Sequence, residues 1–312
     1  MPRYGPPDAF ETPRFSDPRT FMRLPHVRDL DGVDVAVVGI PSDGAQVFRS
    51  GSRFGPEAIR SASVMLRNYN PILDVDVCER LSLVDYGDVP TVPGSTADSL
   101  ERSSAALGDV AAAGIVTLGL GGDHTVLLAE LRALAALHGP LALVQLDAHH
   151  DAWDEYFGQK LFHGSVVRRA AEEGLLDPAR SVQAGMRGSL TAKADAALPA
   201  ELGFDALPYE ELSELGPAAF AHRVRARVGD APCFLSFDVD FVDPAFAPGT
   251  GTPEPGGPSS REALAFVRAL TGLDFRGFDC VEVSPPYDPS GVTAFVAANA
   301  CFEMLSLLAL RR

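Results

Sequence analysis

Long apolar runs, closely spaced cysteines and clusters of basic residues are all absent from this sequence of 312 residues. No run reaches the roughly eighteen apolar residues that a membrane span requires. The first residues, MPRYGPPDAFETPRF, are rich in proline and polar side chains and lack the apolar stretch of a signal peptide. We therefore expect a soluble, cytoplasmic protein that has no membrane partner.

Cysteine is scarce, and its four copies lie far apart without CxxC spacing (Cys78, Cys233, Cys280 and Cys301). Cys233 and Cys280 fall in or beside runs that are typical of core strands. Reduced, buried thiols are therefore expected, and a disulfide framework is not.

Positive charge is also scarce, because the formal net charge is −16. Nucleic-acid binding demands a basic patch, and none is visible, so no nucleic-acid partner is expected. Several of the acids are candidate metal ligands, so their excess favours a cationic substrate only mildly.

Runs typical of β-strands alternate with runs typical of helices along the chain. This alternation predicts an α/β fold with a parallel sheet covered on both faces. With 46% apolar residues the chain can bury one large core, and we predict a single domain over 31–312 after an irregular arm over 1–30. The expected strands are 33–40, 81–87, 114–121, 141–149, 182–187, 233–240 and 278–283, and the expected helices are 55–66, 96–113, 125–138, 164–174, 217–228, 259–271 and 294–310.

Two other segments have a predicted place in this fold. The last helix carries Asn299 and Glu303 within an apolar pattern, which favours packing on the surface over a membrane span. The segment 248–260, PGTGTPEPGGPSS, is too rich in glycine and proline for regular structure. It begins a few residues after Asp240, so we expect a loop that wraps the site described next.

Side chains of metal-ligand type follow three of the predicted strands. Ligands of open parallel sheets bind at the carboxyl ends of strands, where these residues fall. Residues two apart along an extended segment face the same way, so each motif can aim its side chains at one point. GGDH alone is a common turn and DxD alone is a weak signal, but three such motifs at three strand ends indicate a shared metal site. The six candidates are His124, Asp147, His149, Asp151, Asp238 and Asp240.

Four carboxylates and two imidazoles are enough to hold two divalent cations. Oxygen and nitrogen donors without thiolate suit Mn²⁺ best, with Ni²⁺, Co²⁺ and Fe²⁺ as alternatives, and they do not favour a structural Zn²⁺. Two such cations about 3.5 Å apart lower the pKa of a bridging water and turn it into a nucleophile. The motifs therefore predict a binuclear metallohydrolase.

Several residues near these motifs are further candidates. His163 follows the loop 152–162, and its chemistry suits either proton transfer or a structural role. Glu282 ends a predicted strand and can accept a bidentate hydrogen bond from a planar cation, or it can form a supporting salt bridge. Trp153 and Tyr156 can line a pocket or anchor their loop, whereas alternation turns His150 away from the metals.

These residues, in this order, resemble the ureohydrolase family of arginase, agmatinase and the guanidino-acid hydrolases. The resemblance implies a three-layer α/β/α sandwich around an eight-stranded parallel sheet, usually assembled as homotrimers or homohexamers. It also implies a small guanidino substrate from which urea is released. The matching segments span nearly the whole chain: 21–43, 50–60, GGDHT, DAHHD, 236–257 and 281–291.

The resemblance also implies roles for individual residues. Asp147 and Asp238 would bridge two manganese ions, and a hydroxide between the ions would attack the guanidino carbon. Asp151 would pass a proton to the leaving amine, while His163 exchanges protons with solvent. Glu282 would bind the guanidinium of the substrate, and Thr252 would lie near the substrate. One ion would be held by His124, Asp147, Asp151 and Asp238, and the other by His149, Asp147, Asp238 and Asp240.

The expected substrate is a small linear guanidine other than arginine. The loop 151–164 lacks the asparagine and serine pattern by which arginase is expected to hold an amino-acid head group, so agmatine or an ω-guanidino acid such as 4-guanidinobutanoate remains. Segments such as 63–70 look closer to guanidinobutyrase than to agmatinase. The chain departs from the family pattern over 41–51 and at Phe241, and we expect Phe241 and Trp153 to narrow the pocket.

Two alternatives come from other functional classes. One is a catalytically idle partner subunit of a mixed oligomer. The presence of all six candidate ligands, together with His163 and Glu282, argues against it. The other is a deacetylase on a related fold that uses a single Zn²⁺, a chemistry that does not require the fourth carboxylate. Metal content and urea release separate the three hypotheses.

Overall fold

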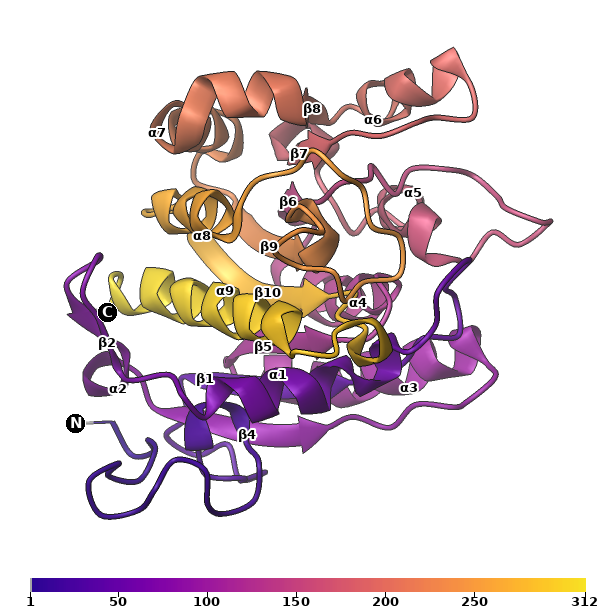
Figure 1. The fold of residues 1–312 in the computed structure, drawn as a ribbon. Helices are drawn as coiled ribbons and strands as arrows, with labels where there is room; N and C mark the ends of the chain where they lie inside the picture. The colour runs from indigo at the N-terminus through magenta and orange to yellow at the C-terminus, as the bar shows by residue number, and fades with distance from the viewer. Residues whose placement is uncertain (1) are drawn as a thin grey trace.

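The computed structural model of the protein describes residues 2–312, which form three layers around an eight-stranded sheet (Figure 1). Every neighbouring pair of strands in this sheet is parallel, in the order β4-β1-β5-β10-β9-β6-β7-β8. This architecture confirms the predicted three-layer α/β/α sandwich. The strands are β1 Val35–Ile40, β4 Leu83–Asp88, β5 Val116–Gly121, β6 Ala142–Leu146, β7 Val182–Met186, β8 Asp205–Pro208, β9 Pro232–Asp238 and β10 Asp274–Val281, with a separate hairpin of β2 Tyr69–Asn70 and β3 Val75–Asp76.

Helices cover both faces of the sheet because its strands are apolar on both sides. One buried cluster joins the sheet to α1, α7, α8 and α9, and a second joins it to α3, α4 and α5. The helices are α1 Gly55–Ser63, α2 Val77–Arg80, α3 Thr96–Ala112, α4 Val126–His138, α5 Val166–Glu172, α6 Leu198–Glu201, α7 Tyr209–Val228, α8 Ser260–Ala269 and α9 Val292–Ala309.

Seven of the strands overlap the ranges expected from the sequence, and the eighth, β8, was not expected. β8 is short, ends in a proline and is only partly buried, so it lacks the apolar run that marks the central strands. β10 begins at Asp274, four residues before its predicted start, because charged and glycine residues interrupt its apolar pattern. The helix expected over 217–228 begins at Tyr209 and is kinked at Gly216, which has a φ of 70°.

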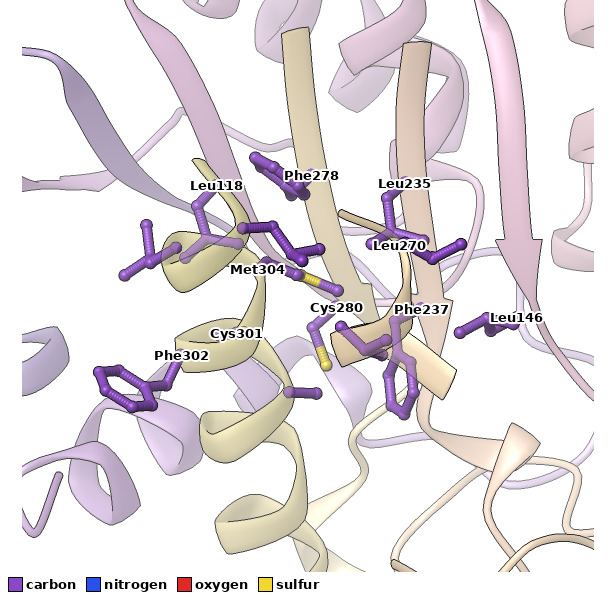
Figure 2. Close-up of a cluster of buried hydrophobic side chains, with 14 of the residues drawn as sticks. Leu118, Leu146, Leu235, Phe237, Leu270, Phe278, Cys280, Cys301, Phe302 and Met304 are labelled. Carbon is purple, nitrogen blue, oxygen red and sulfur yellow. The ribbon is translucent and has the colours of Figure 1, made fainter. Parts of the chain in front are cut away.

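The C-terminal helix α9 packs in the core, and the expectation of a surface helix was wrong. Figure 2 shows Met304 of α9 beside Phe278 and Cys280 of β10, and Phe302 on the other side of the helix, where it also belongs to the buried cluster. Among the described residues, α9 is the one helix that is long and apolar enough to cross a membrane. However, 83% of this helix is buried inside the fold. A helix that is apolar all round is typical of a protein core.

Phe241 also lies in the core, so it does not narrow the pocket as we expected. The short 3₁₀ turn Val239–Phe241 rotates its ring away from the site. The ring meets Phe237 edge-on at 6.0 Å and Phe266 at 6.1 Å between centroids, and it covers the face of Gly185, where a Cβ would overlap it. Phe241 therefore joins β9 to α8.

Replacement of Phe241 by alanine should lower the free energy of unfolding by about 3–5 kcal/mol, because it opens a cavity where the ring is fully buried. Urea denaturation followed by circular dichroism measures the change. Phe10→Ala is the matched control, since Phe10 is fully exposed in the N-terminal arm and its loss should change little. A loss below about 1 kcal/mol for Phe241→Ala would contradict its place in the core.

Candidate metal centre

The six predicted ligands meet at one edge of the sheet, as the strand order requires. His124 follows the end of β5, Asp147 follows β6, and Asp238 ends β9. β9 and β6 are neighbours, and only β10 separates β9 from β5. The carboxyl ends of these strands therefore bring three distant segments of the chain to one place.

Two groups of ligand-type atoms form there and share Asp147. In the first, His124 Nδ1 lies 2.8 Å from Asp151 Oδ2, 3.2 Å from Asp147 Oδ2 and 3.3 Å from Asp238 Oδ2. In the second, His149 Nδ1 lies 3.0 Å from Asp240 Oδ2 and 3.6 Å from Asp147 Oδ1. Asp147 thus presents one oxygen to each group.

Asp238 has a less symmetrical place. Its Oδ2 faces the first group, but its Oδ1 accepts a hydrogen bond of 2.8 Å from the backbone N–H of Asp240. The role of Asp238 as a second bridge therefore stays a prediction.

The donor set fits divalent cations. His124 Nδ1 is buried and has three carboxylate oxygens within 3.3 Å, yet none of them lies in hydrogen-bonding geometry to it. Ligand atoms about 2.1 Å from an octahedrally coordinated cation are about 3 Å apart, which matches these separations. Oxygen and imidazole donors without thiolate suit Mn²⁺ and similar ions.

The electrostatics of the buried ligands point the same way. Burial opposes a charged imidazole, but the nearby carboxylates of Asp147, Asp151 and Asp238 outweigh it and hold the pKa of His124 well above its usual range. Burial together with the charge of Asp147 raises the pKa of Asp151 to about 6. Excess negative charge at the site thus draws in protons, and a bound cation would replace them.

Asp151 and Glu282 are held in a backbone conformation that side-chain-bearing residues rarely adopt. Their φ angles are 48° and 64°, in the left-handed region. Such a conformation costs about 1–3 kcal/mol for each residue and persists only where neighbours enforce it. The Asp151 carbonyl accepts a hydrogen bond from Val167 N at the start of α5, and Glu282 N donates to Gly122 O.

Glu282 lies beneath His163. Its Oε1 is 3.1 Å from His163 Nδ1 and accepts a hydrogen bond of 2.8 Å from His124 N, while Oε2 accepts one of 2.7 Å from Gln46 Nε2. Burial disfavours a charged imidazole, but Glu282 outweighs it and raises the pKa of His163 to about 9. At neutral pH the two side chains therefore form a buried ion pair.

Gln46 is a contact that the sequence analysis missed. It lies in the segment 41–51, which departs from the family pattern. This departure places an amide at the site, where Gln46 donates its hydrogen bond to one oxygen of Glu282. Val47, from the same segment, reaches the cavity described next.

A cavity of about 420 Å³ opens above the candidate ligands. His163 lines it, as do Trp153 and Thr252, whereas Phe241 and Glu282 do not. Thr252 Oγ1 is 3.4 Å from Asp240 Oδ2, and Trp153 packs against the ring of His150, whose Nδ1 accepts a hydrogen bond from Ala152 N. The remaining lining residues are Val47, His149, Asp151, Glu155, Tyr156, Phe162, Gly164, Ser189, Thr191, Asp195, Asp238, Asp240 and Glu254.

Comparison with known proteins agrees with this geometry, since residues 33–306 match the arginase family. The chain belongs to the arginase family. It is 46% identical to guanidinopropionase of Pseudomonas aeruginosa over 97% of this chain and 96% of that protein, and 43% identical to guanidinobutyrase of the same organism over 96% and 94%. The solved structure of proclavaminate amidino hydrolase from Streptomyces clavuligerus superposes with a TM-score of 0.93 at 40% identity, covering 96% of this chain and 100% of that one.

These comparisons confirm the family resemblance that the motifs carried and the eight-stranded fold that it implied. They also identify the chain as an enzyme of the hydrolase class. The individual roles of the site residues remain predictions, and their positions are those described above.

In the metal-free protein, the imidazole of His163 should titrate near pH 9, because Glu282 stabilises its charged form. Glu282→Gln should lower that pKa by removing the carboxylate. NMR of the histidine ring protons measures both values, with His163→Gln to assign the signal. The folded pKa lies above the unfolded value of about 6.5, so the pair stabilises the fold fully below pH 6.5 and loses its contribution as pH rises through 9. An unchanged pKa in Glu282→Gln would contradict the pairing.

Proposed function

We propose that this arginase-family chain is a binuclear manganese amidinohydrolase that converts a small linear guanidine into urea and an amine. The observation that carries the proposal is the shared Asp147 carboxylate, which presents one oxygen to each of two imidazole–carboxylate groups at the floor of a cavity. A buried carboxylate placed in this way suits a pair of neighbouring cations better than a single cation.

When bound, a pair of divalent cations supplies a nucleophile from water and stabilises negative charge that develops on the substrate. Manganese is our choice for the oxygen and nitrogen donors, with Ni²⁺ or Co²⁺ as alternatives. The residues that would hold the pair are His124, Asp147, His149, Asp151, Asp238 and Asp240.

Proton transfer falls to Asp151 and His163, which both line the cavity. The pKa of Asp151, raised to about 6 in the metal-free chain, suits a group that accepts and returns a proton near neutrality. His163 is charged when paired with Glu282 and can give a proton to the leaving amine. Glu282 acts by holding His163, because it lies outside the cavity lining and both of its oxygens already accept hydrogen bonds.

The outer cavity favours a substrate whose far end is not an anion. Glu155, Asp195 and Glu254 contribute carboxylates, and no lysine or arginine is among the lining residues. A carboxylate at the far end would meet repulsion there, while an ammonium group would be attracted. Agmatine, with its terminal amine, is therefore the substrate type that the cavity supports best.

An ω-guanidino acid is the second candidate. The relatives at 46% and 43% identity are named guanidinopropionase and guanidinobutyrase. Ser189 and Thr191 line the outer cavity and have hydroxyl groups that can donate hydrogen bonds to a carboxylate.

Purified protein reconstituted with Mn²⁺ should hold two cations per chain by mass spectrometry and release urea from a guanidine. Asp147→Asn should lower kcat by more than about a hundredfold, since it removes a charge that both groups share. Asp109→Asn, on the exposed face of α3, is the matched control. One zinc per chain without urea would support the deacetylase, and loss of both metal and urea in the parent would support the idle subunit.

Agmatine and 4-guanidinobutanoate form a matched pair of substrates that differ in the charge of the far end. We expect the larger kcat/KM for agmatine, and Glu254→Gln should reduce the agmatine preference by about threefold to tenfold by removing one acid of the outer cavity. Glu11→Gln in the exposed N-terminal arm is the control. A preference for the guanidino acid that Glu254→Gln leaves unchanged would select the second candidate.

A further inference from the structure

Buried polar side chains form a row across the middle of the sheet. Asp279 of β10 pairs in register with Ser236 of β9, Ser236 with Gln145 of β6, and Gln145 with Gln183 of β7. All four side chains are fully buried. Central strands of a parallel sheet are normally apolar throughout, and buried polar groups cost free energy unless they are paired. This polar row therefore requires a physical reason.

The polar row lies directly below the metal centre. Ser236 precedes Asp238 by two residues on β9, and Gln145 precedes Asp147 by two residues at the end of β6. Residues two apart on a strand face the same side and are about 6.6 Å apart. The row thus supports the candidate ligands from within the sheet, and none of its members lines the cavity.

The first arm of the row leads to His124. Ser236 Oγ lies 2.9 Å from His124 Nε2, and Asp279 Oδ1 accepts a hydrogen bond of 3.3 Å from the backbone N–H of Phe237, the next residue of β9. His124 Nδ1 faces the carboxylates of the proposed centre, so where it holds a cation the single proton of the neutral ring lies on Nε2. Ser236 must then accept from His124 Nε2–H, which leaves the lone pair of Nδ1 directed at the carboxylates of the centre.

Glu130 of α4 completes this arm. Its carboxyl group and Asp279 both lie at the open face of Gly119, and both oxygens of Glu130 are buried without a donor among the described residues. Burial and the charge of Asp279 raise the pKa of Glu130 well above its usual range. Gly119 of β5, in register with Asp279, leaves the space, since a Cβ there would overlap the Glu130 carboxyl.

The second arm leads to Asp147. Gln145 Nε2 donates a hydrogen bond of 2.6 Å to Asp147 Oδ2, the oxygen that faces His124. Gln145 Oε1 in turn accepts one of 2.5 Å from Gln183 Nε2, which also donates to His150 O at 2.7 Å. The carboxylate accepts only, so the amide of Gln145 has one usable orientation and holds Asp147 in one rotation.

We propose that the polar row is the positioning layer of the metal centre. Ser236, with Asp279 and Glu130 behind it, sets the ring orientation and tautomer of His124. Gln145, with Gln183 behind it, sets the rotation of the shared Asp147. The inference rests on the proposed metal centre and adds residues that touch neither cation nor substrate.

Ser236→Ala tests the first arm, because it removes one hydroxyl and leaves the ring of His124 without its partner. Its dissociation constant for Mn²⁺, measured by competition with a chelator, should rise about tenfold to a hundredfold. The far-ultraviolet circular dichroism of the metal-free variant should match that of the parent, and KM for the guanidine at saturating Mn²⁺ should stay within about twofold of the parent value. Gln145→Met, which keeps the length and loses the amide, should show the same pattern through Asp147.

Ser181→Ala is the matched control. Its hydroxyl is also buried, accepts a hydrogen bond of 2.8 Å from Leu143 N and donates one of 2.7 Å to Asp177 O, at the opposite end of the sheet. Equal loss of Mn²⁺ affinity in Ser181→Ala, or parental affinity in both Ser236→Ala and Gln145→Met, would overturn the inference while the proposed function stands. A parent chain that binds no divalent cation would overturn both.

Discussion

Four carboxylates buried beside only two imidazoles are the constraint on which the rest of the structure depends. Such a concentration of negative charge is unstable in a protein interior unless cations or protons neutralise it. The parallel sheet creates it, since strand ends from three parts of the chain converge where helices on both faces exclude water. The metal centre is thus a direct product of the topology.

How far the sequence predicts this site depends on how local each feature is. Asp147, His149 and Asp151 lie within five residues after one strand, so their closeness can be predicted from the sequence. The left-handed backbone that places Asp151 in the first group lies beyond the end of β6 and has no sequence pattern that indicates it. The polar row has no such signature, because Ser236, Gln145 and Gln183 become neighbours only through the register between strands. Gln46 reaches Glu282 from 236 residues away, which no pattern along the chain indicates.

Two wrong expectations share one cause, which is that position along the chain does not fix the direction of a side chain. Phe241 follows Asp240 at once, yet a single 3₁₀ turn sends its ring into the core. Helix α9 carries Glu303, which suggested a solvent-facing side, yet Asn70 and Arg268 bind that carboxylate within the fold. In both cases tertiary packing determined the outcome.

The left-handed backbone at Asp151 and Glu282 has a consequence for how this enzyme can be altered. Glycine adopts that conformation without a steric penalty, so Gly at either position would relieve backbone strain while deleting an acid of the site. Selection for thermal stability alone would therefore favour variants that are more stable but inactive. Laboratory evolution of this scaffold has to screen for turnover and thermal tolerance together.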